Sequence, residues 1–382
     1  MNLLALAGDI DALIAQIRLV TPLTALCQRH GWTLTLKSFH DCAGDDVRQA
    51  QVLVVQRAST ARVWRLQQMM QRQGGAVIYD IDDLLTDVAP HISNQAAVRQ
   101  RVPMLLRCMH TADVVSVSTA RLGLELGLEL GQEFGSQLGL HAAVEVPNFA
   151  WEAAKLKPPT PQPGLPVTLL FASSDQLAAH FMYPALRALE GVKIVVVGPP
   201  AQGFVQAGLH VDAQPLMPRE AFVAFARSLP NVLAVIPLEA SRFAACKSAV
   251  KWFDYAAAGV PTLCSAVSPY AEVILDDVTG GLVPNEPEAW RSALCRAVAD
   301  DAWRARIARA AHAQVLAHHS LAITLQAWEL AVSQALERSA DRPAAPTGSW
   351  QGLRDRWWSQ ADGVALWLRT LNRARLAKRS RR

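Results

Sequence analysis

Eleven short runs of apolar residues recur along the chain, separated by stretches whose hydrophobic positions follow the three- and four-residue spacing of helices. The runs do not alternate between apolar and polar residues, which is typical of strands buried on both faces of a parallel sheet. Strands interleaved with helices predict an α/β protein. The predicted strands are 3–7, 33–39, 51–56, 75–80, 112–118, 167–173, 192–198, 209–213, 231–237, 261–265 and 280–284.

The pattern breaks at residues 147–166, which contain six prolines and no hydrophobic periodicity. We interpret this stretch as a boundary between two domains. The predicted organisation is a Rossmann-like domain at 1–150, a linker at 151–166, a second Rossmann-like domain at 167–338, and a tail rich in Trp and Arg at 339–382. Doubly wound parallel sheets bind ligands beyond the carboxyl ends of their strands, so the two domains are expected to face a common cleft.

The composition favours a soluble cytoplasmic protein. Hydrophobic residues make up 51% of the 382 positions, enough for two cores. The six cysteines show neither a C-x-x-C pair nor the spacing of zinc ligands, so no disulfide framework is predicted and the reducing cytoplasm is the simplest location. The N-terminal apolar run lacks the basic residues of a signal peptide, and no segment has the roughly 18 uninterrupted apolar residues of a membrane span.

The net charge of +4 is unevenly distributed. Residues 341–382 carry ten Lys/Arg and three Asp, a net charge of +7, which leaves −3 for the first 340 residues. This balance does not indicate a nucleic-acid partner. In the tail, an apolar stripe from Trp350 to Leu371 recurs at helical spacing. Such a basic amphipathic helix suits an anionic membrane surface at the cytoplasmic face, which we predict, or packing against the body of the protein.

The stretch "KSAVKWFDYAAAGVPTLCS" (247–265) predicts a helix, a Gly-Val-Pro break and a buried strand. Lys247, Lys251 and Asp254 are four and three residues apart, so they are expected to share one helical face. By spacing alone, such a face is usually a solvated surface. The residues around it are therefore needed to decide whether these three side chains form a site.

That stretch, continued through "SPYAEVILDDVTGGLVP", resembles the C-terminal domain of the GT-B glycosyltransferases of the retaining "glycosyl transferases group one". "GAVIYDIDDLL" and "ADVVSVSTARL" are similar to N-terminal segments of the same group. The resemblance implies two Rossmann-like domains and transfer of a sugar from a nucleoside-diphosphate sugar, with retention of configuration. The acceptor is expected to be a glycan or a lipid-linked molecule in cell-surface polysaccharide assembly, and no cofactor beyond the donor substrate is implied.

The resemblance also assigns candidate site residues. In the family an acidic residue on this helix binds the donor ribose, and Asp254 has that position. Lys247 and Lys251 are candidates to stabilise the departing diphosphate, because that step needs positive charge near a helix N-terminus. Further candidates for donor binding are Ser173, Ser174, Gly8, Asp82 and Glu272.

Two features of the sequence leave other functions open. The family has a glutamate where this chain has Cys246, and residues 171–186 lack the Arg and Lys that usually bind the diphosphate there. A non-catalytic GT-B-like partner in a glycan-assembly complex is therefore an alternative. A GT-B-fold sugar-nucleotide epimerase is another, and it needs acid–base carboxylates and histidine in the cleft.

The segment "DIDD" at 80–83 follows a predicted strand and contains D-x-D, a pattern that binds Mg²⁺ or Mn²⁺ in another glycosyltransferase fold. It lies in the first domain, whereas the donor motif lies in the second, so no metal site is predicted. Asp80 and Asp82 are expected to line the cleft, and Asp83 is expected to cap the following turn. Gly8 ends the first strand and is expected to line the cleft as well.

Overall fold

The computed structural model describes residues 1–88, 95–134, 143–151, 156–159, 162, 164–173 and 180–342. They form two compact units. The first contains Met1–Asp82, Gln100–Val146 and the chain from Leu325 onward; the second contains Asp83–Arg99 and Pro147–Thr324. The chain therefore passes between the units more than once.

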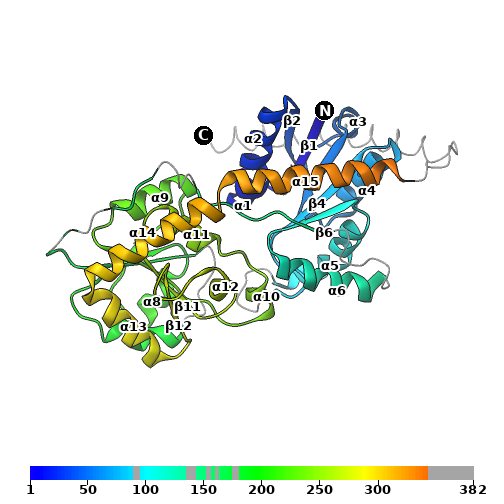
Figure 1. Cartoon of the computed structure of the whole chain (residues 1–382). Coiled ribbons are helices and arrows are strands. Elements are labelled where there is room, and N and C mark those ends of the chain that lie inside the picture. The colour runs from blue at the N-terminus through cyan, green and yellow to red at the C-terminus, as the bar shows by residue number, and fades with distance from the viewer. Residues whose placement is uncertain are drawn as a thin grey trace, which may run out of the picture. The chain divides into compact units, whose positions relative to one another are not determined.

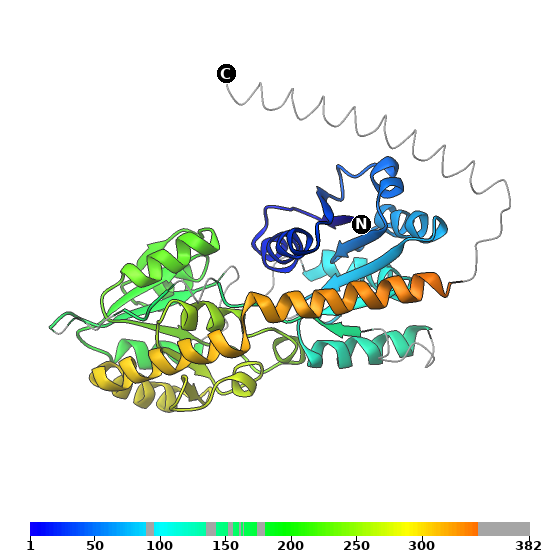
Figure 2. The ribbon, with the colours of Figure 1, turned by 45° about the horizontal axis from the view of Figure 1, so that its top comes forward.

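The first unit is built on a six-stranded parallel sheet with the order β2-β1-β3-β4-β5-β6. Its strands are β1 (Asn2–Ala7), β2 (Thr33–Ser38), β3 (Val52–Gln56), β4 (Ala76–Ile81), β5 (Val114–Val117) and β6 (Ala143–Glu145). The helices are α1 (Leu13–Ala15), a π-helical segment (Gln16–Val20), α2 (Thr21–His30), α3 (Gly44–Gln49), α4 (Ala61–Arg72), α5 (Gln95–His110), α6 (Ala120–Phe134) and α15 (Leu321–Ala340). The first residues of α5 and α15 group with the second unit. Helix α15 lies beside this sheet in both views (Figures 1 and 2).

The second unit is built on another six-stranded parallel sheet, with the order β12-β11-β10-β7-β8-β9. Its strands are β7 (Thr168–Ala172), β8 (Lys193–Val197), β9 (Asp212–Gln214), β10 (Val232–Ile236), β11 (Thr262–Ser265) and β12 (Gly281–Val283). A 3₁₀ turn (His180–Met182) precedes the helices α7 (Tyr183–Arg187), α8 (Ala201–Gln206), α9 (Arg219–Ser228), α10 (Arg242–Ala245), α11 (Val250–Ala257), α12 (Tyr270–Val273), α13 (Pro287–Ala299) and α14 (Asp301–His318).

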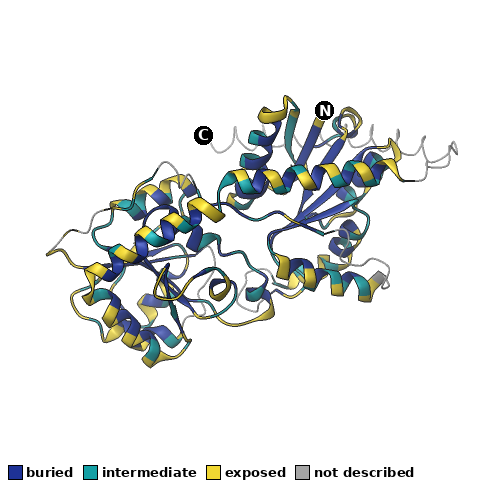
Figure 3. Ribbon diagram, viewed as in Figure 1, coloured by how far each residue is buried: buried dark blue, intermediate teal, exposed yellow. Residues whose placement is uncertain are grey.

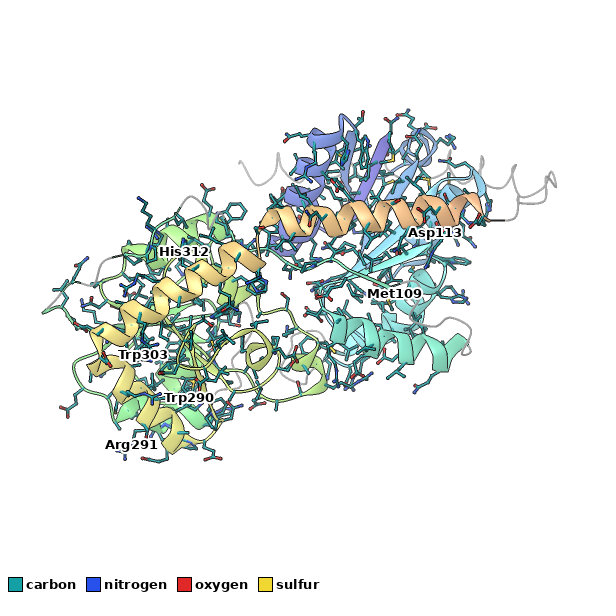
Figure 4. The ribbon with its side chains drawn as sticks, in the orientation of Figure 1. Met109, Asp113, Trp290, Arg291, Trp303 and His312 are labelled. Atoms are coloured by element: carbon teal, nitrogen blue, oxygen red, sulfur yellow. The ribbon has the colours of Figure 1, made fainter. Side chains whose placement is uncertain are left out.

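The central strands of both sheets are buried (Figure 3). All five residues of β3 and all five of β10 are buried, as expected for strands covered by helices on both faces. In the second unit, Trp290 of α13 and Trp303 of α14 belong to one cluster of buried residues against the sheet (Figure 4). At Gly281 of β12, a Cβ would lie 2.5 Å from the side chain of Leu263, so a larger residue there would force Leu263 to move.

The predicted fold class is confirmed, since both halves are parallel α/β sheets. The two units do not coincide with the predicted domains. Residues 83–99 group with the second unit, although they follow β4 of the first sheet, and so does the chain from Pro147 onward, which includes the predicted linker. Helix α15 from Leu325 groups with the first unit. The predicted amphipathic tail helix lies outside the described residues. Among the helices that the structure describes, none is long and apolar enough to cross a membrane.

The end of α15 is held to the first unit by Asp113, whose label in Figure 4 lies near that end of the helix. The Asp113 carboxylate accepts hydrogen bonds from Arg342 Nη2 (2.5 Å) and from the Val77 N–H (2.7 Å). The Asp113 carbonyl accepts a third from Arg338 Nη1 (2.9 Å). These bonds join the last described helix to the loop between α5 and β5.

Replacing Asp113 with alanine is expected to lower the free energy of unfolding by about 2 kcal/mol, because a half-buried arginine and a strand N–H both lose their acceptor. Urea denaturation followed by circular dichroism measures this change in the free energy of unfolding. The matched control is Asp341→Ala, an exposed aspartate near the same helix end, which is expected to change stability by less than about 0.5 kcal/mol. Equal effects of the two variants would contradict the proposed anchoring.

Candidate active site

The second sheet has a topological switch point between β7 and β10. These strands are neighbours, but the chain continues from β7 to β8 and β9 on one side, and from β10 to β11 and β12 on the other. Loops that leave such a pair of strands in opposite directions open a crevice at their carboxyl ends, where α/β proteins bind ligands. The residues following β7 and β10 are therefore the first place to look for a site.

Two predicted site residues meet at this switch point. Lys251, on α11 after β10, donates from Nζ to the Ser173 hydroxyl, which follows β7, over 3.4 Å. Ser173 is buried, and its N–H donates to the carbonyl of Val197 at the end of β8. Gly198 comes next with φ of 94°, and a Cβ there would lie 2.3 Å from the Ser173 carbonyl oxygen. Glycine therefore allows this close approach. Ser174 lies outside the described residues.

Lys247 does not lie on the helix that the sequence predicted. Helix α10 ends at Ala245 and α11 begins at Val250, so Lys247 occupies the bend between them. The prediction that three charged residues share one helical face is wrong for Lys247. The apolar spacing continues through the break, but Ala249, with ψ of 28°, departs from helical geometry.

Lys247 and Lys251 are four residues apart in the sequence, with Lys247 before the first residue of α11 and Lys251 in its first turn. The N-cap residue of α11 is Ala249, whose side chain has no polar atom that could cap the helix. Backbone N–H groups in the first turn of a helix attract anions, and they do so more strongly beside lysines. The bend and the first turn of α11 therefore carry one lysine on each side of a positive helix end, residue types that favour a diphosphate.

Asp254 is paired with an arginine that no sequence pattern predicts. Arg219 of α9 forms a salt bridge with Asp254 of α11, and its Nε lies 2.9 Å from both carboxylate oxygens. Arg219 Nη2 also donates to the carbonyl of Phe149 (2.7 Å). Burial raises the pKa of the Asp254 carboxyl above its usual value, while Arg219 acts in the opposite direction. A ribose at Asp254 must share the carboxylate with Arg219, so the predicted ribose contact stays a prediction.

Each described carboxylate of "DIDD" is paired with a different cation. Asp80 lies 2.6 Å from Arg18 Nη2 in a fully buried pair, and it also accepts from Ser116 (2.8 Å). Asp82 forms a bidentate pair with Arg57, at 2.5 and 2.7 Å. Asp83, expected to cap a turn, lies 3.3 Å from Lys247 Nζ. Within the described residues, no three His, Cys, Asp or Glu side chains are grouped closely enough to hold a metal ion.

Comparison with known proteins identifies the fold. Residues 176–329 match a protein-family model described as "Glycosyl transferase-like". HepE of Anabaena, solved in complex with UDP-glucose, is similar with a TM-score of 0.57 and 14% identity, over 87% of this chain and 100% of HepE. Sucrose-phosphate synthase of Thermosynechococcus elongatus gives a TM-score of 0.61 and 17% identity, over 86% and 98% of the two chains. The chain has the GT-B fold.

A third similar structure is a putative UDP-N-acetylglucosamine 2-epimerase from Listeria monocytogenes, with a TM-score of 0.53 and 12% identity, over 90% of this chain and 98% of that one. No curated protein matches the chain. At these identities the solved structures show the GT-B fold, and the family model shows a glycosyl transferase-like region that lies mainly in the second unit. The resemblance inferred from the sequence is confirmed at that level.

In this GT-B chain, Cys246 is completely buried at the end of α10. The resemblance implies a glutamate at this position, and a buried thiol offers neither a carboxylate nor an exposed polar group. Glu272 of α12 is exposed and accepts a hydrogen bond from the Ser268 hydroxyl (2.5 Å). That hydroxyl lies 3.2 Å from the carbonyl of Ala245, so Glu272 lies close to the end of α10.

The first unit has its own switch point, between β1 and β3. Gly8 follows β1 and is exposed, in the position expected for a residue that lines a site at this edge. Arg57 follows β3 and has φ of 50°, which is strained for a residue with a side chain. The sequence pattern does not reveal Arg57 and Arg219, because no local spacing relates an arginine to a carboxylate that is 25 or 35 residues away.

Proposed function

We propose that this protein is a glycosyltransferase that moves a sugar from a nucleoside-diphosphate donor to a glycan or lipid-linked acceptor. The contact between Lys251 and Ser173 supports it most directly, because it brings a cation to the switch point of the glycosyl transferase-like unit. Lys247 and the uncapped start of α11 add positive charge along the same stretch of chain. An uncharged ligand would gain little binding energy from these positive groups, whereas both phosphates of a diphosphate can form charge-assisted hydrogen bonds with them.

In the proposed reaction the bond between the anomeric carbon and the diphosphate oxygen breaks, and an acceptor hydroxyl oxygen forms the new bond to that carbon. Negative charge grows on the departing diphosphate. Lys247 and Lys251 stabilise that charge through fixed positive groups that need no rearrangement at the moment of reaction. In a retaining reaction, which the family resemblance supports, the leaving phosphate oxygen takes the acceptor's proton, so no side-chain base is required.

Uridine is the first base to test, since HepE binds UDP-glucose in its structure. The role in cell-surface polysaccharide assembly, and a contact of the basic tail with an anionic membrane, remain part of the proposal and rest on sequence alone. The non-catalytic alternative is favoured by one observation, the burial of Cys246. The epimerase alternative is less supported, because Asp80, Asp82 and Asp83 are all paired with cations.

A thermal-shift panel with UDP, GDP, dTDP, ADP and CMP tests the donor site. A nucleotide present at about 100 times its dissociation constant stabilises the folded state by about 2.7 kcal/mol, and so is expected to raise the melting temperature by about 5 °C or more. The shift is expected to fall sharply in Lys251→Ala. The matched control is Lys193→Ala, an exposed lysine at the amino end of β8 in the same sheet. If no nucleotide shifts the wild type at millimolar concentration, the donor site is refuted and the non-catalytic alternative replaces it.

A further inference from the structure

We infer that Asp83 sets the donor affinity and the charge selectivity of the proposed site, because its carboxylate occupies the place of a phosphate on Lys247. This inference rests on the proposed function and goes beyond it. Asp83 belongs to the segment 83–99, which groups with the second unit. Its carboxylate oxygen lies 3.3 Å from Lys247 Nζ, where an oxygen of a bound diphosphate is expected.

The environment of Lys247 supports an exchange of anions there. Its ammonium group lies 4.4 Å from the centroid of the Phe243 ring, a contact that holds the cation in place without neutralising it. Asp83 supplies the negative charge, and both side chains are partly exposed, at 20% for Asp83 and 30% for Lys247. A second anion can therefore reach this pair from solvent.

Among the "DIDD" pairs, Asp83 differs from its neighbours in burial. The carboxylates of Asp80 and Asp82 are 0% and 6% exposed, so separating either from its arginine would leave a charge without solvation. The Asp83 carboxylate is more exposed, and water can solvate it when it leaves Lys247. Partly exposed pairs are weak enough for a multiply charged ligand to displace.

A second ion pair keeps the acidic segment beside α10. Arg242 is the first residue of α10, and its Nη1 lies 3.8 Å from the Asp87 carboxylate. The side chains of Asp87 and Arg242 are 51% and 39% exposed. The segment thus offers two carboxylates to two cations, one at each end of the stretch from Arg242 to Lys247. A ligand with one negative charge gains little by displacing Asp83, whereas a diphosphate brings more charge to the lysine than it removes.

The test is the dissociation constant of UDP, measured by isothermal titration calorimetry on full-length variants. Asp83→Asn removes the competing charge and is expected to tighten UDP binding about fivefold, the equivalent of a partly exposed ion pair. UMP carries less charge, so its affinity is expected to increase less than that of UDP in Asp83→Asn. Asp83→Glu keeps a carboxylate within reach of Lys247 and is expected to stay near the wild-type affinity.

Two controls isolate the contact with Lys247. Asp87→Asn removes the same charge from the same segment and is expected to leave UDP affinity unchanged within twofold. Lys247→Ala is expected to weaken UDP binding, and adding Asp83→Asn to it is expected to have no further effect. Equal tightening by Asp83→Asn and Asp87→Asn, or tightening that persists in the Lys247→Ala background, would show a general charge effect and overturn the inference.

The outcomes also separate this inference from the proposed function. If the wild type binds UDP through Lys251 and Asp83→Asn binds no tighter, Asp83 is not a competitor but the donor site stands. If Asp83→Asn binds UDP and the wild type does not, the inference is supported directly. If neither protein binds any nucleoside diphosphate, the donor site and the role of Asp83 are both refuted.

Discussion

Replacing Lys251 with alanine is expected to lower the rate of diphosphate release from the nucleotide sugar by about 10²–10³-fold, the loss typical of removing one fixed group that stabilises charge in a transition state. Lys251 is the second residue of α11 and contacts Ser173 at the switch point, so its ammonium group is held at the carboxyl ends of β7 and β10. The charge on the leaving group is greatest as the bond breaks. The loss is therefore expected mainly in kcat, with a smaller change in KM.

The measurement is steady-state release of UDP, or of whichever nucleotide the thermal-shift panel selects, from the corresponding sugar donor. Lys251→Arg keeps the positive charge but not its compact geometry, and it is expected to retain part of the activity. Lys193 lies at the amino end of β8, away from the carboxyl ends of the strands, and Lys193→Ala is expected to behave as the wild type. A Lys251→Ala variant that retains kcat within threefold would exclude this lysine from the chemical step.

The sequence predicted the sheets well because most of their strands are buried on both faces. Each predicted run contains or overlaps an observed strand, and the least accurate, 209–213, overlaps β9 at Asp212 and Ala213. The strand that was missed, β6, has three residues, Ala143–Glu145, and one of them is an exposed glutamate. A run so short and polar carries no periodic signal, and it is defined by pairing with β5.

The site was predicted less completely, because its contacts join distant parts of the chain. Sequence spacing placed Lys251 and Ser173 among the candidates, and the sheet order explains why they meet. It did not reveal that Lys247 precedes the helix, since a four-residue interruption between α10 and α11 leaves the apolar spacing intact. Nor did it show that Asp83 pairs with Lys247, 164 residues later.

Replacing Arg219 with methionine is expected to lower the free energy of unfolding by about 3–5 kcal/mol, because it leaves the Asp254 carboxylate buried without its cation. The side chains of Arg219 and Asp254 are only 5% and 13% exposed. The guanidinium also lies over the rings of Phe149 and Trp151, at 5.1 and 5.4 Å from their centroids. The Arg219 side chain thus connects α9, α11 and the segment from Phe149 to Trp151.

Urea denaturation of four proteins measures this coupling: the wild type, Arg219→Met, Asp254→Leu and the double variant. An apolar pair of similar volume has no buried charge, so the double variant is expected to recover a large part of the lost stability. The matched control is Arg187→Met, an exposed arginine at the end of α7, with an expected change below about 0.5 kcal/mol. Additive losses in the double variant would mean that the two charges do not depend on each other.

The same pair decides what Asp254 contributes to donor binding. If the carboxylate binds the ribose as well as Arg219, Asp254→Asn is expected to weaken UDP binding about tenfold while leaving the affinity for inorganic pyrophosphate, which has no ribose, unchanged. If Asp254 serves only to hold Arg219, the affinities for UDP and for pyrophosphate are expected to change by the same factor. Any such change is then expected to accompany a loss of stability. Because Arg219 already takes both oxygens of the carboxylate, a ribose contact would require the diol to compete for lone pairs with a buried guanidinium.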